Sequence, residues 1–165
     1  MHASELEELH RSRYALLRTF RSDGTPVDTP IWFHLDGTTL VFRTKVGPKT
    51  RRIAAVPRVE VRACDHRGRV SQGAAITAGP ATVLAGREAD DANRALQRRY
   101  GWQYNVVPLL KIPGVRNVHS GLPLREKVRK ARDRGVWDDS VIVRIDLEVP
   151  CESTTELSAG PSPIH

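Results

Sequence analysis

The sequence lacks the features that mark several large protein classes. It has two cysteines, Cys64 and Cys151, in 165 residues, which is too few for a disulfide framework or a four-cysteine zinc site. No run approaches the ~18 consecutive apolar residues that a membrane helix needs. The first residues, MHASELEELHRSRY, contain no apolar block of the kind that a secretory signal has. We therefore expect a reduced, cytoplasmic protein without membrane contact.

Sequence motifs of common catalytic sites are also missing. There is no G-x-G-x-x-G, and Gly47-Pro48-Lys49-Thr50 fails as a P-loop because proline replaces the glycine that must precede the lysine. There is no G-x-S-x-G nucleophile elbow. The six histidines are scattered singly, so we predict no metal site. No catalytic side chain can be identified from the sequence.

Basic residues, by contrast, are abundant and unevenly placed. The chain carries 26 lysines and arginines against 19 acids, a net charge of +7. Residues 43–69 hold nine basic and two acidic side chains, residues 87–134 hold twelve and five, and both ends are acidic. Two basic blocks between acidic ends indicate a localised anionic partner. For the second block, a solvated helix face explains the pattern equally well.

Alternating apolar residues and short turns predict a small β-barrel. Ser22-Asp23-Gly24 and Asp36-Gly37 are typical hairpin turns and join the first three strands into a meander. The predicted strands are 14–20, 27–35, 39–44, 58–65, 74–84 with a bulge at Gly79-Pro80, and 140–147. The predicted helices are 4–12, 49–55, 88–100 and 123–134. Pro30 predicts an edge position or bulge in the second strand.

Six strands with tight early hairpins and no alternation of strand and helix favour an antiparallel barrel over a doubly wound sheet. The fold class is therefore mainly β, with flanking helices. Residues 1–150 form one domain with a partly helical excursion at 101–135. Residues 151–165 are polar and rich in glycine and proline, so we expect a disordered tail.

One segment, RTKVGPKTRR at residues 43–52, has the residues of a phosphate site. A strand ends at Arg43-Thr44, and after a Gly-Pro turn a helix opens with Lys49, Thr50 and Arg51. A helix N-terminus favours negative charge, hydroxyls donate hydrogen bonds, and arginine adds bidentate geometry. Acids usually occupy a first helical turn, and this turn has none. We therefore prefer a phosphate site to a basic surface cap.

The neighbouring strand offers a wall for a planar ring. In residues 29–33, Pro30 and Trp32 share one face of the strand, and Ile31 and Phe33 share the other. One of these faces must be core, and the other is free to support a ligand. Further along the chain, Tyr100, Trp102 and Tyr104 either line an acceptor pocket or are ordinary core aromatics, and we favour the core.

In their order and spacing these segments resemble a known family. LRTFRSDGTPVDTPIWF, a strand ending in RT, then K-T-R-R-I, V-P-R-V-E-V and C-D-x-x-G are similar to the split β-barrel flavin and deazaflavin oxidoreductases. These are the pyridoxamine 5′-phosphate oxidase-like proteins, and the resemblance is strongest to their coenzyme F420-dependent branch, which RRYGW at 98–102 also fits. The similarity covers residues 14–147.

The resemblance implies a six-stranded split barrel that forms a homodimer with the cofactor at the subunit interface. It implies that the cofactor's phosphate is held by the lysine and threonine after the third strand, and that the rings lie against the second strand. The implied cofactor-binding residues are Pro30, Ile31, Trp32, Phe33, Arg43, Thr44, Lys49, Thr50 and Arg51. The C-terminal end lacks the full pattern for a pyridoxamine phosphate substrate.

Charge favours coenzyme F420 over FMN, because F420 carries an oligoglutamate tail that would suit a second basic block, on the helices around residues 111–134. The predicted function is transfer of a hydride between reduced F420 and a small organic acceptor. The alternatives are an FMN-dependent oxidoreductase of the same fold and a non-catalytic flavin or tetrapyrrole binder. We expect no nucleic-acid partner, because the basic residues are not interleaved with exposed aromatics.

Overall fold

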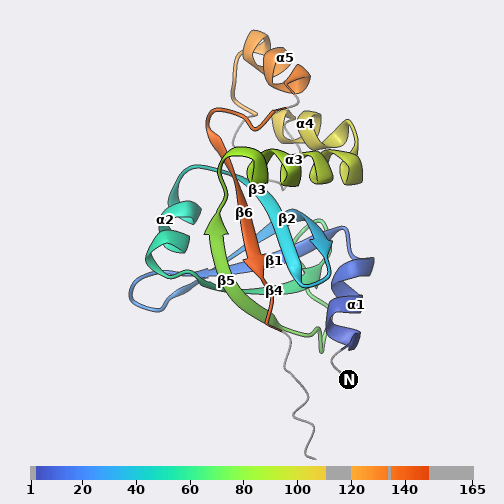
Figure 1. Cartoon of the computed structure of the whole chain (residues 1–165), viewed down its shortest axis with the longest axis vertical. Helices are drawn as coiled ribbons and strands as arrows, with labels where there is room; N and C mark the ends of the chain where they lie inside the picture. The colour runs from blue at the N-terminus through green and yellow to red at the C-terminus, as the bar shows by residue number, and fades with distance from the viewer. Residues whose placement is uncertain (1–2, 111–119, 134, 149–165) are drawn as a thin grey trace, which may run out of the picture.

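In the computed structural model, which describes residues 3–110, 120–133 and 135–148, six strands close into an antiparallel barrel (Figure 1). Around the barrel the strands follow the order β1-β2-β3-β6-β5-β4. The strands are β1 (Tyr14–Phe20), β2 (Pro26–Asp36), β3 (Thr39–Lys45), β4 (Arg58–Cys64), β5 (Thr77–Val83) and β6 (Ser140–Asp146). The predicted mainly β class and six-stranded split barrel are confirmed. The predicted tail at 151–165 lies outside the described residues.

The helices surround the barrel unevenly. They are α1 (Ala3–Arg11), α2 (Pro48–Ala55), α3 (Gly86–Tyr100), α4 (Gln103–Val106) and α5 (Leu124–Arg132), with a 3₁₀ turn η1 (Val107–Leu109) after α4. Figure 1 shows α3, α4 and α5 together at one end, with α1 and α2 on opposite flanks. The predicted excursion is helical where it is described, and residues 111–119 lie outside the description. No helix in the described ranges is long and apolar enough to cross a lipid bilayer.

Two hydrophobic clusters hold these layers together. Alternate residues of the strands point into the barrel, so Leu17, Phe33 and Phe42 are fully buried there. The opposite faces of β3 and β6 are buried too, because Val41 and Ile142 pack against α3. Burial of both faces of β3 fixes the direction in which the chain leaves that strand and enters α2.

The fifth strand departs from the sequence prediction. It begins at Thr77 rather than at residue 74, and the predicted bulge at Gly79-Pro80 is wrong. Pairing there is regular but changes partner: Gly79 pairs with Val59 of β4, whereas Ala81 pairs with Ile145 of β6. A Cβ on Gly79 would lie 2.0 Å from the Asp146 carbonyl oxygen, so glycine is required by this close approach.

The predicted edge position of Pro30 has a structural basis in the pairing of β2. Pro30 pairs with Leu16 of β1, while pairing with β3 begins only at Phe33. The first half of β2 therefore has a ladder on one side, and a residue without an amide hydrogen is tolerated there.

Candidate functional site

Helix α2 begins at a turn that the sequence determines locally. Pro48 occupies the first helical position, where its fixed φ fits and its missing amide hydrogen costs nothing. The amide of Gly47 donates to Thr50 Oγ1, and that hydroxyl donates back to the Gly47 carbonyl, both at 2.9 Å. The Thr50 hydroxyl, predicted to bind phosphate, therefore caps its own helix in this structure.

The first turn of α2 keeps a net positive character. It contains no acid, and the last turn of the helix contains Arg52. The amide of Arg51 already donates to the Gly47 carbonyl at 3.0 Å. The amides of Lys49 and Thr50 remain as the backbone donors without an intrahelical acceptor. A helix start of this kind attracts an anion through two amides and the helix dipole.

Lys49 is half-buried at this turn. Within the described residues its ammonium forms no hydrogen bond or ion pair. Burial, together with the nearby charge of Arg52, lowers the pKa of Lys49 to about 8. A partly buried cation without a counter-ion is unfavourable in the free protein and becomes favourable when an anion binds. Lys49 is thus the sequence-predicted residue whose environment best fits a phosphate ligand.

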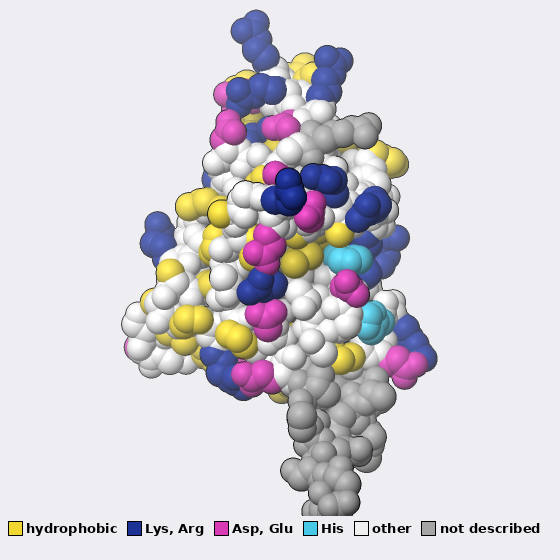
Figure 2. Space-filling view, viewed as in Figure 1, with side chains coloured by type: hydrophobic (Ala, Val, Ile, Leu, Met, Phe, Trp, Pro, Cys, Tyr) yellow, Lys and Arg dark blue, Asp and Glu magenta, His cyan; other side chains and the backbone are white. Residues whose placement is uncertain are grey.

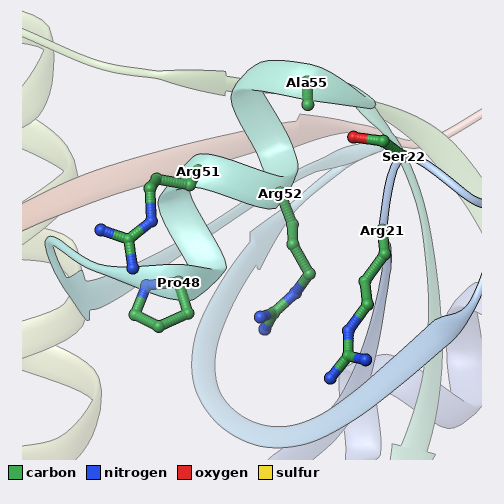
Figure 3. A pocket seen from close by; sticks show the side chains of 6 residues that line it. All are labelled: Arg21, Ser22, Pro48, Arg51, Arg52 and Ala55. Carbon is green, nitrogen blue, oxygen red and sulfur yellow. The ribbon is translucent and has the colours of Figure 1, made fainter.

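Beside this turn lies a shallow concavity of about 270 Å³ between α2 and the β1–β2 hairpin (Figure 3). Its lining residues are Arg21, Ser22, Pro48, Arg51, Arg52 and Ala55. We call it the hairpin–helix concavity. Figure 3 shows the Arg21 and Arg52 side chains running side by side, one from the hairpin and one from the helix. Among the sequence-predicted residues, Arg51 alone lines it.

Arg21 and Arg52 were not predicted from the sequence as site residues. Arg52 directly follows Arg51, so the sequence alone could have indicated that Arg52 lies near the site. Its Nε donates to the buried Thr19 hydroxyl at 2.8 Å. Desolvation, then the charges of Arg21 and Arg51, lowers the pKa of Arg52. Arg21 adjoins a predicted hairpin turn, but the direction in which that hairpin bends depends on the closed barrel.

Arg43, also predicted to bind the cofactor, is engaged by the protein itself. Its guanidinium donates to the Tyr104 carbonyl at 2.5 Å and to Asn105 Oδ1 at 3.0 Å. It lies 3.8 Å from the ring centroid of Tyr104 and 4.1 Å from that of Trp137. Burial lowers the pKa of Arg43. Two cation–π contacts and two hydrogen bonds make Arg43 the link between β3 and α4.

Further contacts extend this link to α5. We call Arg43, Tyr104, Asn105, Lys130 and Trp137 the Arg43 cluster. The Asn105 amide donates to the Asp133 carbonyl at 2.9 Å, and the Trp137 indole donates to the Lys130 carbonyl at 3.0 Å. Lys130 is buried and pairs with Asp139 at 3.0 Å. The cluster therefore anchors α4 and α5 to the end of β3, next to the turn that leads into α2.

The predicted ring wall divides as strand alternation requires. Ile31 and Phe33 are buried in the core, so only their backbone can face a ligand. Pro30 is exposed and Trp32 half-buried. Trp32 stacks on Tyr100 with ring centroids 4.7 Å apart and an interplanar angle of 24°. The Pro30–Trp32 face is thus the ligand-accessible part of the wall.

Of the three aromatics of uncertain role, Tyr100 and Tyr104 are core residues, as predicted, and Trp102 is not. Tyr100 donates to the Phe33 carbonyl at 2.7 Å and accepts from the Phe33 amide at 2.9 Å, which ties α3 to β2. Tyr104 donates to Asn93 at 2.8 Å. Trp102, in contrast, is 70% exposed, so the core interpretation is wrong for it.

The second basic block is only partly in view. Helix α5 carries most of its described lysines and arginines, and Figure 2 shows basic side chains gathered over that end of the molecule. Residues 111–119 and 134 of the predicted block lie outside the described residues. Helix α5 packs on α4, whereas α2 packs on β1, β3 and β5. The start of α2 with Lys49, which we call the cationic corner or simply the corner, is therefore formed by a different part of the chain.

Metal and thiol chemistry find little support in the described ranges. There, no group of three or more His, Cys, Asp and Glu residues is placed to hold a metal ion. Cys64 is half-buried and free, and burial, with the charge of Asp65, raises the pKa of its thiol to about 11. The thiol is thus protonated near neutral pH and is a poor nucleophile.

Solved structures share this fold across nearly the whole chain. The haem storage protein HutZ from Vibrio cholerae matches with a TM-score of 0.56 at 10% identity, covering 88% of this chain and 89% of that one. An FAD-binding protein from Mesorhizobium loti matches with a TM-score of 0.54 at 19% identity, covering 88% of both chains. An F420 reductase matches with a TM-score of 0.50 at 21% identity, covering 86% and 91%. At these identities the likeness concerns the fold.

Sequence comparison assigns the family. No curated protein matches the chain in sequence. A family model described as pyridoxamine 5′-phosphate oxidase, however, matches residues 2–132, which is most of the chain. That span includes the barrel strands β1 to β5 and helix α2 with Lys49. The chain therefore belongs to the pyridoxamine 5′-phosphate oxidase family, whose split-barrel fold is that of flavin- and F420-binding oxidoreductases.

Proposed function

We propose that this protein is an oxidoreductase that uses coenzyme F420 to transfer a hydride to a small organic acceptor. The observation that carries the proposal is Lys49, a half-buried ammonium at the start of α2 without a partner among the described residues. Within a fold of flavin- and F420-binding proteins, such a cation at a helix start suits the phosphate of a redox cofactor.

The predicted site residues take different parts in this proposal. Lys49, with the amides of Lys49 and Thr50, would hold the phosphate, and the Thr44 hydroxyl stands at the end of the adjoining strand. The rings would lie along the Pro30–Trp32 face, with the backbone of Ile31 and Phe33 behind them. Arg43 acts indirectly by fixing α4 beside the corner, because its guanidinium is already bonded to α4.

A bound reduced deazaflavin would supply a hydride, two electrons with one proton, to an acceptor that takes up a second proton from water. The chain's own task is to align the two partners and to limit the access of water. Neither task requires a side chain that acts as an acid or base. In the described part of the chain, the cations Lys49 and Arg52 lie on α2, and no carboxylate lines the neighbouring concavity.

Charge supports F420 over the runner-up, FMN. FMN presents one phosphate, whereas F420 adds the carboxylates of its tail. Lys49 lies at the start of α2. The neighbouring concavity is lined by three arginines and by no acid. A single phosphate would leave much of that positive charge uncompensated. The proposed enzyme works as a homodimer with its cofactor between the subunits, as the family resemblance implies, and the low cysteine content suits a cytoplasmic location.

The test is a binding titration of F420 and FMN, followed by absorbance and fluorescence, on the wild type and on Lys49→Ala. We expect F420 affinity to fall about tenfold or more, the equivalent of ~1.4 kcal/mol, because a charge-assisted contact to phosphate is lost. Lys45→Ala is the matched control, because Lys45 is exposed and lies four residues earlier. Equal F420 affinity in the wild type and Lys49→Ala contradicts the proposal, as does tighter binding of FMN than of F420.

A further inference from the structure

We infer that the hairpin–helix concavity is a second oxyanion site, which takes a phosphate or carboxylate group of a multiply charged ligand. It adjoins the corner at Lys49, but Lys49 does not line it. The ligand group is either the anionic tail of the cofactor or a separate multivalent oxyanion. Only the first case rests on the proposed function.

The charge of the concavity is concentrated and uncompensated by its walls. Three of its six lining residues are arginines, and the other three are uncharged. Arg52 feels both other arginines, because their charges help to lower its pKa. The charge of Arg21 is one of the causes that lower the pKa of Asp23 in the hairpin, but the Asp23 carboxylate does not line the concavity and accepts from the Thr25 amide at 2.9 Å within its own turn. Like charges gathered without a carboxylate between them are relieved by a bound anion.

The donors of the concavity are partly fixed in place. Arg52 is anchored through Nε to the buried Thr19 hydroxyl, which leaves the two terminal nitrogens of its guanidinium for a ligand. The guanidinium groups of Arg21 and Arg51 form no hydrogen bond or ion pair within the described part of the chain. Arginine forks match phosphate and carboxylate oxygens in a bidentate way, so this donor set selects oxyanions.

The size of the concavity limits the ligand to a small group. Its 270 Å³ falls below the ~300–1,000 Å³ that pockets for whole drug-sized ligands have. A phosphate or a short carboxylate chain fits this volume. Because Lys49 senses the charge of Arg52, the corner and the concavity are electrostatically coupled. A ligand with two separated anionic groups would therefore use both.

The first experiment titrates inorganic tripolyphosphate into the full chain and follows the heat of binding at low salt. We compare the wild type with the double variant Arg21→Gln, Arg51→Gln. Both residues are exposed, so the fold should be unaffected, and the melting temperature checks this. The matched control is Arg67→Gln, Arg87→Gln, which removes the same charge from exposed positions outside the lining. We expect tripolyphosphate affinity to fall at least tenfold in the double variant and less than twofold in the control.

The second experiment separates the two sources of the ligand and uses F420 and FMN as probes. A loss of F420 affinity with unchanged FMN affinity in the double variant assigns the concavity to the cofactor's tail. If the double variant binds F420 and FMN as tightly as the wild type does, while the wild type binds tripolyphosphate, the concavity is assigned to a separate oxyanion. Lys49→Ala keeps these failures distinct, because it should weaken F420 binding about tenfold or more and weaken tripolyphosphate binding less than the double variant does. The inference is overturned if the wild type does not bind tripolyphosphate, or if the double variant binds it equally well.

Discussion

The Arg43 cluster and the hairpin–helix concavity each contain an arginine of the basic stretch at residues 43–69, and the two arginines, Arg43 and Arg51, have opposite environments. In the Arg43 cluster, the guanidinium is sandwiched between two aromatic rings and donates to α4. In the concavity, Arg21 and Arg51 are exposed and have no bonded partner among the described residues. The difference teaches that arginines a few positions apart can serve the fold or a ligand, and that their partners, not their spacing, decide which.

The largest change in the free energy of unfolding is expected from Arg43→Ala. It removes two hydrogen bonds and two cation–π contacts from a half-buried position, so we expect a loss of about 3 kcal/mol in the free energy of unfolding. Urea unfolding measures this loss. Arg87→Ala, at an exposed position, is the control and should change stability by less than ~0.5 kcal/mol. Equal stability of both variants would remove the structural role of Arg43.

A smaller change is expected at Lys49, whose contribution to the free energy of unfolding depends on pH. The pKa of Lys49 is lowered from 10.5 to about 8 in the folded chain, so the unfolded chain binds more protons between about pH 8 and 10.5. Stability contributed by this residue is therefore lowest below pH 8 and rises with pH across that window. Lys49→Met removes the charge and keeps the alkyl stem. We expect it to be more stable than the wild type at pH 7.

Urea unfolding of both proteins between pH 7 and 9.5 tests this expectation. The difference between Lys49→Met and the wild type should shrink as the pH rises, because the wild-type lysine loses its proton. Lys45→Met, at an exposed position, is the control and should show a difference that does not vary with pH. A constant difference for Lys49→Met would contradict the buried, unpartnered state of its ammonium.

The smallest effect is expected for stability in the double variant Arg21→Gln, Arg51→Gln. These exposed side chains bond to no described residue, so neutralising them should change the free energy of unfolding by no more than ~0.5 kcal/mol. The change should be a slight gain, because repulsion with Arg52 is reduced, and it should fade at high salt. A loss of more than 1 kcal/mol would make these arginines structural, like Arg43.

The sequence predicted the barrel well because its signals are local. Alternation placed β1 at Tyr14–Phe20, and the Gly-Pro turn placed α2 within one residue of its start. The bulge at Gly79-Pro80 was mispredicted because the reason for Gly79 is a distant contact with Asp146. Small residues in a strand indicate a close approach but do not name the partner.

The candidate site was predicted less completely, because its partners come from distant parts of the chain. Lys49 could be proposed from the helix start alone. The contact of Arg43 with the Trp137 ring could not be predicted from the sequence, because it depends on how a distant part of the chain folds back onto β3. Arg21 enters the site only through the direction of the β1–β2 hairpin, which closure of the barrel sets. Local pattern therefore predicted a candidate site at the start of α2, and tertiary structure shows which of the neighbouring arginines have a bonded partner among the described residues.

A crystal structure of the protein with F420 bound tests the central claim most directly. The account predicts the cofactor's phosphate within hydrogen-bonding distance, about 3 Å, of Lys49 Nζ, with its rings against Trp32. It also predicts that Arg43 keeps its place between Tyr104 and Trp137. Cofactor density elsewhere on the barrel, with Lys49 Nζ touching no ligand atom, would contradict it.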